Sequence, residues 1–300
     1  MQDQNLNRRL FLGSMAVTGV SLAGAAYGEE RLKEPVFRVS KKEPTQVAVQ
    51  PAAAAQVDEH PLDPALQLAH ETLAFIRSDV VDFTATIVKR ERVKGTLGNF
   101  EYMAAKIRNH KEQDGVITQP LSVYLNFLKP DNIKGREVIW VEGQNNGKMR
   151  AHEGGLLGRT LPSVWLDPHG ALAMRGNLHP IDEIGIENLV VKLIDKGDRD
   201  RQYGECQVEF IKGTSINKVP CTLLKVGHPV QRDHFEFFEA HIFIDDKTKV
   251  PLRYAAYHWP TDPNDPKTMQ VIEEYTYLDM KLNVGLTDAD FDPENPNYGF

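Results

Sequence analysis

Residues 82–89 read DFTATIVK, and apolar side chains alternate there with others at Phe83, Ala85 and Ile87. An alternation of period two is typical of a β-strand with one face buried. The same period returns in three later stretches, at Tyr102, Ala104 and Lys106, at Val123, Leu125 and Phe127, and at Val138 and Trp140. Turn residues separate the stretches, most clearly Asn145-Asn146-Gly147, because Asn and Gly tolerate positive φ. The sequence therefore predicts half-buried antiparallel strands joined by short turns.

Two other stretches have the period of an amphipathic helix. Asp63-Pro64, an acidic cap followed by a first-turn proline, opens the first helix, whose apolar face carries Leu66, Ala69, Leu73 and Ile76. The second helix runs from about Ile181 to Asp195, with the spacing of a helix buried on one side. Further strands are expected over 206–211, 221–226, 235–244, 252–258 and 269–280. The simplest arrangement is a single α+β domain over 61–300, with two helices against a long antiparallel sheet.

The first 60 residues differ from the rest in composition. Arg8-Arg9 precede an apolar, small-residue run from Leu10 to Ala26, which is typical of a twin-arginine-type export signal over 1–28. An uncleaved signal-anchor is the alternative, although the run is weakly apolar for a spanning helix. Residues 29–60 are rich in Lys, Glu, Pro, Gln and Ala and are predicted to form a disordered linker. The sequence thus predicts a periplasmic or otherwise extracytoplasmic protein.

Charge and cysteine content narrow the function classes further. With 300 residues the chain can bury a core without disulfides, and its net charge of −7 disfavours a nucleic-acid partner. A two-residue turn at Asn217-Lys218 would place Cys221 opposite Thr214 and Cys206 opposite Pro229, which separates the two sulfurs by about 26 Å. We therefore expect two buried, reduced thiols and no disulfide, unless the loop is longer or other strands bring the cysteines together.

The sequence carries no signature of a catalytic or metal-binding site. No histidine has the spacing of a metal site, so neither a metal nor a cofactor is predicted. The side chains of His152-Glu153 diverge on an extended chain, and Glu273-Glu274 face opposite sides of a strand. No Gly-x-Ser-x-Gly elbow is present, and the Gly-rich stretch 154–158, GGLLG, lacks the lysine of a P-loop. That stretch is either a mobile flap or merely a connection.

An apolar surplus surrounds the Gly-rich stretch and consists of Trp140, Leu156, Leu157, Leu161, Trp165, Leu172 and Met174. These side chains either gate an apolar cavity or complete the core, and the sequence leaves both interpretations open. As candidate ligand-binding residues at a lid or rim we take Trp140, Leu156, Leu157, Trp165 and Met174.

Three motifs in the last third resemble those of the LolA-like outer-membrane lipoprotein-sorting proteins and occur in the same order: INKVPC at 216–221, IFIDDKTKVPLR at 242–253 and DMKLNVGLTDADF at 279–291. Over nearly all of Asp63 to Phe300 the chain also resembles a secreted bacterial family, domain of unknown function fifteen-seventy-one, through stretches such as KRER at 89–92 and AHEGG at 151–155. The LolA-like resemblance implies a half-open antiparallel barrel whose concave apolar face, lidded by two helices, holds acyl chains of lipoproteins or other lipids. The loop from Gly154 to Gly176 and the twin-arginine signal depart from that pattern.

Three functions remain open on these grounds. The favoured one is a non-enzymatic extracytoplasmic binding protein that holds an acyl chain, lipid or lipoprotein in an apolar half-barrel cavity. The second is an envelope scaffold or regulatory module with a packed core, whose acidic surface contacts another envelope protein. The third is a hydrolase that uses His152 and Glu153.

Overall fold

The structure is a computed structural model, and it describes residues 34–39, 60–156, 158 and 160–300. Residues Pro35–Phe300 form one compact unit. The export signal predicted at 1–28 and residues 40–59 of the predicted linker lie outside the described residues. Within the described part of the chain, no helix is long and apolar enough to cross a membrane.

An antiparallel sheet of 13 strands forms most of this unit, and the strands at its two ends do not pair with each other. From one end to the other the strands are β1 (Phe37–Arg38), β11 (Gln207–Ile216), β12 (Val219–Gly227), β13 (Glu239–Asp245), β14 (Pro251–His258), β15 (Gln270–Leu282), β2 (Asp82–Val93), β4 (Glu101–Arg108), β7 (Ser122–Lys129), β8 (Glu137–Val141), β9 (Met149–His152) and β10 (Val164–Leu166). Beside this path β3 (Thr96–Leu97) pairs with β2, and β5 (Lys111–Gln113) and β6 (Val116–Gln119) form a separate hairpin.

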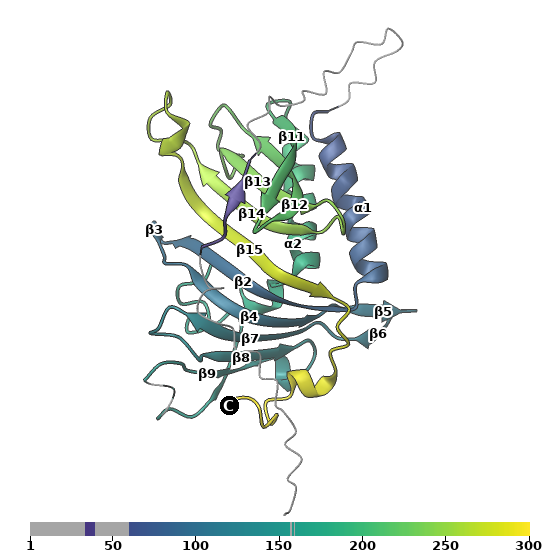
Figure 1. Ribbon diagram of the computed structural model, residues 1–300, viewed down its shortest axis with the longest axis vertical. Helices are drawn as coiled ribbons and strands as arrows, with labels where there is room; N and C mark the ends of the chain where they lie inside the picture. Colours follow the sequence, from purple (N-terminus) through teal and green to yellow (C-terminus); the bar gives the residue numbers. More distant parts are fainter. Residues whose placement is uncertain (1–33, 40–59, 157, 159) are drawn as a thin grey trace, which may run out of the picture. The chain divides into compact units, whose positions relative to one another are not determined.

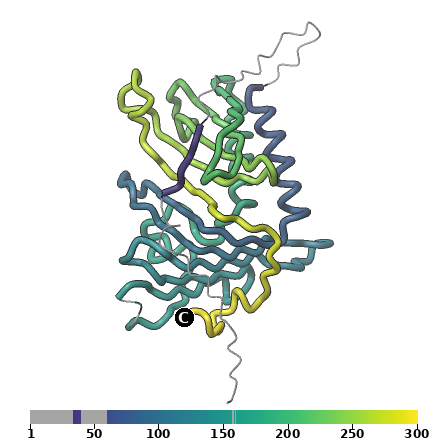
Figure 2. Tube along the Cα trace, viewed as in Figure 1, coloured from purple at the N-terminus to yellow at the C-terminus, as the bar shows by residue number. Residues whose placement is uncertain are grey.

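From β2 onward the chain starts in the middle of this sheet and fills its two halves in turn (Figure 1). Strands β2 to β10 run outward to one edge, and the chain then crosses to β11 and returns inward through β14. Figure 2 shows the last strand, β15, lying between the green strands of one half and the blue strands of the other. Because β15 pairs with β2, residues far apart in sequence face each other there, such as Glu273 and Glu91.

Two helices, α1 (Asp63–Asp79) and α2 (Ile186–Asp200), pack on one face of the sheet, which we call the inner face. Leu66 of α1 joins Leu224 and Ile242 of β12 and β13 in one buried cluster. The two helices approach closely at Gly197, where an added Cβ would lie 2.7 Å from a Leu66 methyl carbon. The predicted α+β fold, a long curved antiparallel sheet with two helices on its concave face, is confirmed.

Several local predictions are also confirmed, and others need correction. The first helix begins at Asp63 as predicted, although Asp63 is its first residue and Leu62 stands at the cap position. Asn145-Asn146-Gly147 turns between β8 and β9 with positive φ at all three residues. The second helix begins at Ile186 instead of Ile181, because Gly185 adopts a φ of 130° that ends a separate turn before it. The strand predicted over 235–244 begins only at Glu239. The short 3-10 helices are η2 (Asn145–Gly147), η4 (Ile181–Glu183), η5 (Pro266–Thr268) and η6 (Asp288–Phe291).

The register predicted around the cysteines holds next to the turn and shifts beyond it. Cys221 lies opposite Thr214, as predicted, but an irregularity between Ile211 and Thr214 displaces the rest of the ladder by one residue. The pairing of Cys206 with Pro229 is therefore wrong, since β11 begins at Gln207 opposite Gly227. Cys206 and Cys221 are separate buried thiols, and burial raises the pKa of each to about 11.

Part of the segment predicted as linker forms a strand. Phe37 and Arg38 pair with Ile216 and Ser215 at the end of β11. The Phe37 ring lies over the guanidinium group of Arg253, whose central carbon is 4.1 Å from the ring centroid. A single aromatic side chain therefore anchors this short strand on the outer face of the sheet.

Candidate binding cavity

A cavity of about 650 Å³ lies between the inner face of the sheet and residues 161–185, which we call the cover segment. Cavities that hold small molecules in proteins have volumes of roughly 300–1,000 Å³. Strands β2, β4, β7, β8 and β9 contribute apolar side chains to one wall, and the rest of the lining includes side chains of α2 and of the cover segment, which contains the edge strand β10. Its apolar lining includes Ile87, Met103, Leu125, Phe127, Val138, Met149, Leu166, Leu189 and Leu193. The cavity therefore offers a mainly apolar environment to a ligand.

The mouth of this cavity lies beside β10. Six of the described lining residues are exposed to solvent, and all of them fall between residues 153 and 175: Glu153, Leu161, Pro162, Val164, Leu172 and Arg175. A residue that both lines a cavity and is exposed stands where the cavity opens. Four of the six are apolar, so the opening itself is apolar.

Two buried carboxylates line the cavity at the centre of the sheet. Glu91 of β2 and Glu273 of β15 face each other across the strand pair, and each is 6% exposed. The Tyr275 hydroxyl donates to Glu91 Oε1 at 2.5 Å and lies 3.1 Å from Glu273 Oε2. Burial and the two carboxylates raise the pKa of Tyr275, so its hydroxyl keeps its proton and remains a donor.

The cover segment is attached to these carboxylates. His179 Nε2 lies 2.7 Å from Glu273 Oε2, and the backbone N–H of Leu178 donates to Glu91 Oε2 at 3.1 Å. Lys89 also reaches Glu91, with its Nζ 3.2 Å from Oε2. Hydrogen bonds to charged groups that are partly withdrawn from water are stronger than those between neutral groups. The polar network therefore holds the cover segment on the sheet.

Helix α2 joins the same network through Lys192. Its ammonium group donates to His179 Nδ1 at 2.9 Å and also pairs with Glu183. When His179 is neutral, its Nδ1 accepts the bond from Lys192 and its Nε2 donates to Glu273. When His179 is protonated, its Nδ1 carries a hydrogen and donates to Glu183, 3.2 Å away. The sheet, the cover segment and α2 thus meet at one imidazole.

The charge state of this imidazole depends on opposing effects. Burial lowers the pKa of His179, but the hydrogen bond and charge of Glu273 outweigh burial and leave that pKa raised. Burial likewise raises the pKa of Glu273, and the hydrogen bond and charge of His179 outweigh it, so the pKa of Glu273 is lowered. The two groups therefore favour an ion pair at mildly acidic pH.

We expect the stability that this ion pair contributes to be greatest between about pH 4.5 and 6.5, the ordinary pKa values of the two side chains. A lowered Glu273 pKa contributes stability above pH 4.5, which is lost as the pH falls through the folded-state pKa. A raised His179 pKa contributes stability below pH 6.5, which is lost as the pH rises through the folded-state pKa. Thermal midpoints of the wild type and His179→Gln measured across pH should differ most within this window.

The control for this series is His70→Gln on the exposed face of α1, which should change the midpoint little at any pH. A difference between wild type and His179→Gln that stayed constant from acid to alkaline pH would contradict the ion pair.

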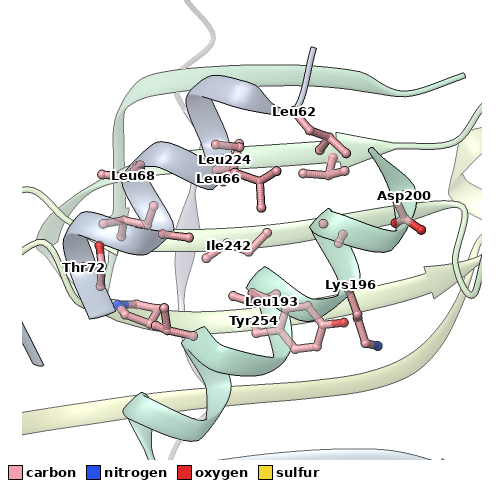
Figure 3. A pocket seen from close by; sticks show the side chains of 18 of the residues that line it. Leu62, Leu66, Leu68, Thr72, Leu193, Lys196, Asp200, Leu224, Ile242 and Tyr254 are labelled. Carbon is pink, nitrogen blue, oxygen red and sulfur yellow. The ribbon is translucent and has the colours of Figure 1, made fainter. Parts of the chain in front are cut away.

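Figure 3 shows a second, smaller cavity of about 80 Å³ between α1, α2 and strands β12 to β14. Leu66, Leu193, Leu224 and Ile242 point toward one another there, and the lining is mainly apolar. Leu193, Lys196 and Tyr254 line both cavities, so the two are neighbours. The helix-covered half of the sheet is therefore closely packed, and the large cavity belongs to the half under the cover segment.

Four of the five candidate residues named from the sequence are described, and none of the four lines this cavity. Trp140 is buried and lines a separate polar cavity of about 370 Å³, while its indole N–H donates to Gly147 O at 3.2 Å. Leu156 is 84% exposed, Trp165 is 40% exposed, and Met174 is half-buried outside the cavity lining. Leu157 lies outside the described residues. Leu161 and Leu172, from the same apolar surplus, do line the cavity at its mouth.

His152 and Glu153, the pair considered for hydrolysis, both line the cavity. Glu153 accepts from the Arg136 guanidinium at 2.9 Å, and His152 lies opposite Glu137 in the strand pair β8 and β9. Glu273 and Glu274 point to opposite sides of β15, as the sequence predicts, because Glu273 faces the cavity and Glu274 pairs with Arg253. Both are buried.

Sequence reasoning missed the polar network itself. One signal was available, because Lys89 and Glu91 continue the alternation of Phe83, Ala85 and Ile87 and are therefore charged residues at inward positions. Their partners on the cover segment and α2 could not be read from spacing, since about 90 residues separate Lys89 from His179.

Comparison with known proteins places the chain in a family. The family model described as "Protein of unknown function (DUF1571)" matches residues 80–300. The chain belongs to this family. Both the cavity and the cover segment fall within the DUF1571 match, and the resemblance drawn from the sequence is confirmed. A search of curated proteins gives no significant match.

Solved structures similar to this DUF1571 protein are distant in sequence. A DUF1329 family protein from Desulfovibrio piger is 11% identical with a TM-score of 0.37, over 78% of this chain and 98% of that one. A domain assigned to outer membrane lipoprotein sorting from Vibrio parahaemolyticus is 12% identical with a TM-score of 0.36, over 76% and 95%. A LolA superfamily protein from Nitrosomonas europaea is 10% identical with a TM-score of 0.29, over 76% and 97%. At this degree of likeness, nothing about a ligand carries over to this chain.

Proposed function

We propose that this DUF1571 protein is an exported, non-enzymatic binding protein that holds an acyl chain of a lipid or lipoprotein in the large cavity. The observation that supports the proposal is the cavity of about 650 Å³ with mainly apolar walls and an apolar mouth. Each methylene group that moves from water into such a cavity contributes about 0.8 kcal/mol to binding. An acyl chain is the common biological group whose binding is favoured most by apolar walls, because it consists of methylene groups. The export signal predicted at 1–28 supports a location outside the cytoplasm.

The polar network gives this cavity a second chemical feature. Glu91, Glu273 and Tyr275 already accept and donate hydrogen bonds within the protein. A ligand therefore need not supply a polar partner for them, and the apolar walls dominate its binding. The scaffold alternative rested on a fully packed core, and a cavity of this size removes that premise.

Filling the cavity tests the proposal directly. Ala151 of β9 lines the cavity between Val138 and Val164, so Ala151→Trp would place an indole where the acyl chain is proposed to lie. We expect the wild type to bind a palmitoyl probe at one per chain in native mass spectrometry, and Ala151→Trp to bind it at least about tenfold more weakly. That factor corresponds to the loss of about two methylene contacts.

Val116→Trp is the matched control, because Val116 is 64% exposed on the β5–β6 hairpin and lines no part of the cavity. It should bind the probe like the wild type. The proposal would be rejected if the wild type neither co-purified with lipid nor took up the probe, or if the two tryptophan variants bound it equally.

A further inference from the structure

We propose that the cavity mouth docks on the surface of an anionic lipid bilayer, so that an acyl chain passes between bilayer and cavity without crossing water. This inference rests on the proposed function and adds the surface at which the ligand is exchanged. Three observations carry it: exposed apolar side chains around the mouth, an exposed tryptophan on the edge strand, and an excess of basic residues beside them.

The apolar side chains at the mouth are exposed to an unusual extent. Leu161, Val164 and Leu172 are 46%, 44% and 57% exposed, and all three line the cavity. They are therefore continuous with the apolar walls within. Apolar groups gathered at one opening are stabilised when a bilayer replaces water around them.

The edge strand β10 presents apolar side chains on both of its faces. Val164 points to the cavity, and the neighbouring Trp165 points to the other face, where it is 40% exposed. The Arg150 guanidinium lies over the Trp165 ring, 5.2 Å from its centroid. Tryptophan is enriched at membrane–water interfaces, where its apolar ring and its N–H group contact different layers. Strand β10 is apolar on both faces and stands at the end of the described sheet. Such a strand suits shallow insertion at the membrane–water interface.

Charge distinguishes this region from the rest of the chain. The described residues within 148–176 include three Lys and Arg against two Asp and Glu, whereas the whole chain has a net charge of −7. One of the acidic residues, Glu153, is paired with Arg136. Among the described residues, no carboxylate pairs with Lys148 or Arg175, and both side chains are exposed. Unpaired basic groups beside exposed apolar ones are the combination that binds anionic headgroups.

Vesicle sedimentation of the full chain tests this docking. Vesicles of phosphatidylcholine mixed with phosphatidylglycerol should bind the wild type, and Leu172→Asp should bind at least about tenfold more weakly, because a charged residue would enter the interface. Ile117→Asp is the matched control, since Ile117 is 49% exposed on the separate β5–β6 hairpin. It should bind like the wild type.

Two further substitutions test the contribution of the basic side chains to vesicle binding. Lys148→Gln and Arg175→Gln should each weaken binding to the mixed vesicles by about fivefold, the effect of removing one basic group from an anionic surface. Neither substitution should change binding to vesicles of phosphatidylcholine alone. Hydrogen exchange of the same samples separates docking at the mouth from any binding through residues 10–26, because only docking at the mouth slows exchange over 161–175.

The outcomes are distinct from those of the cavity test. If the palmitoyl probe binds but the vesicles leave exchange over 161–175 unchanged, the docking inference is overturned and the proposed function stands. If the vesicles bind and the probe does not, the proposed function fails. Equal binding of Leu172→Asp and Ile117→Asp would also overturn the inference, and protection of 161–175 by an envelope protein alone would assign the mouth to a protein partner.

Discussion

Replacing Glu274 with glutamine is expected to lower the free energy of unfolding by about 3–5 kcal/mol, since it leaves a buried arginine without its counter-charge. Glu274 and Arg253 are each 3% exposed, and Arg253 Nη2 donates to Glu274 Oε2 at 2.5 Å. The remaining contacts of the guanidinium are neutral, namely the Thr276 hydroxyl at 3.0 Å and the Phe37 ring. Glutamine preserves the shape of the side chain, so the change isolates the charge. Urea unfolding measures the effect.

The control uses the same substitution in an exposed pair. Glu205 accepts two hydrogen bonds from Arg232, at 2.6 and 2.8 Å, and the side chains of Arg232 and Glu205 are 47% and 39% exposed. Glu205→Gln should therefore leave the urea midpoint almost unchanged, because water solvates both groups once they separate. Glu274 Oε1 also pairs with Arg90, whose side chain is partly exposed. Glu274→Met with Arg253→Met leaves only this more exposed arginine without a counter-charge, so the double variant should destabilise less than Glu274→Gln alone. Equal shifts for Glu274→Gln and Glu205→Gln would contradict the role of burial.

The sheet could be predicted from the sequence because its signals are local. Alternation of period two marks β2, and positive φ at Asn217 and Lys218 supports the hairpin whose register near Thr214 is correct. Errors appear where the backbone departs from ideal geometry, as in the one-residue shift beyond Ile211. Such irregularities insert a residue without a clear signature in side-chain pattern.

The C-terminal motif shows why a recognised pattern can mark structure and not a ligand. Within it, the backbone N–H groups of Val284, Gly285 and Leu286 all donate to the carboxylate of Asp82 at the start of β2. This buried carboxylate holds the segment that follows β15 against the start of β2. The motif therefore identifies the fold and says nothing about what the cavity holds.

The cavity could not be predicted, because its walls meet only through long-range pairing. Glu273 meets Glu91 through the β15–β2 ladder, and the cover segment contacts Glu273 through His179 and Glu91 through the Leu178 N–H. The apolar surplus near the Gly-rich stretch pointed to the correct region, since Leu161 and Leu172 form the mouth. The composition of this stretch did not distinguish Leu161 and Leu172 from Trp165 or Leu156. The exposure and direction of side chains in this region depend on the register of the three-residue strand β10.

Replacing Gly154 with alanine is expected to destabilise the protein by about 3 kcal/mol, at the upper end of typical overpacking effects. A Cβ at this position would lie 2.4 Å from both the backbone nitrogen of Arg136 and the carbonyl oxygen of Ile133. Backbone atoms of an ordered turn cannot rotate away as a side chain does, so the two segments must separate. Urea unfolding measures the change in free energy.

Gly204→Ala is the matched control, because an added Cβ there meets no atom within 4 Å. It should be neutral or slightly stabilising, since alanine restricts the unfolded chain.

The Gly154→Ala and Gly204→Ala variants also decide between the two interpretations of the Gly-rich stretch. The N–H of Gly155 donates to Lys134 O at 2.7 Å, which anchors the start of the stretch on the turn between β7 and β8. A mobile flap would tolerate alanine at 154 as readily as at 204, whereas an anchored connection would not. Loss of stability confined to Gly154→Ala would therefore assign this stretch to the fixed frame of the mouth.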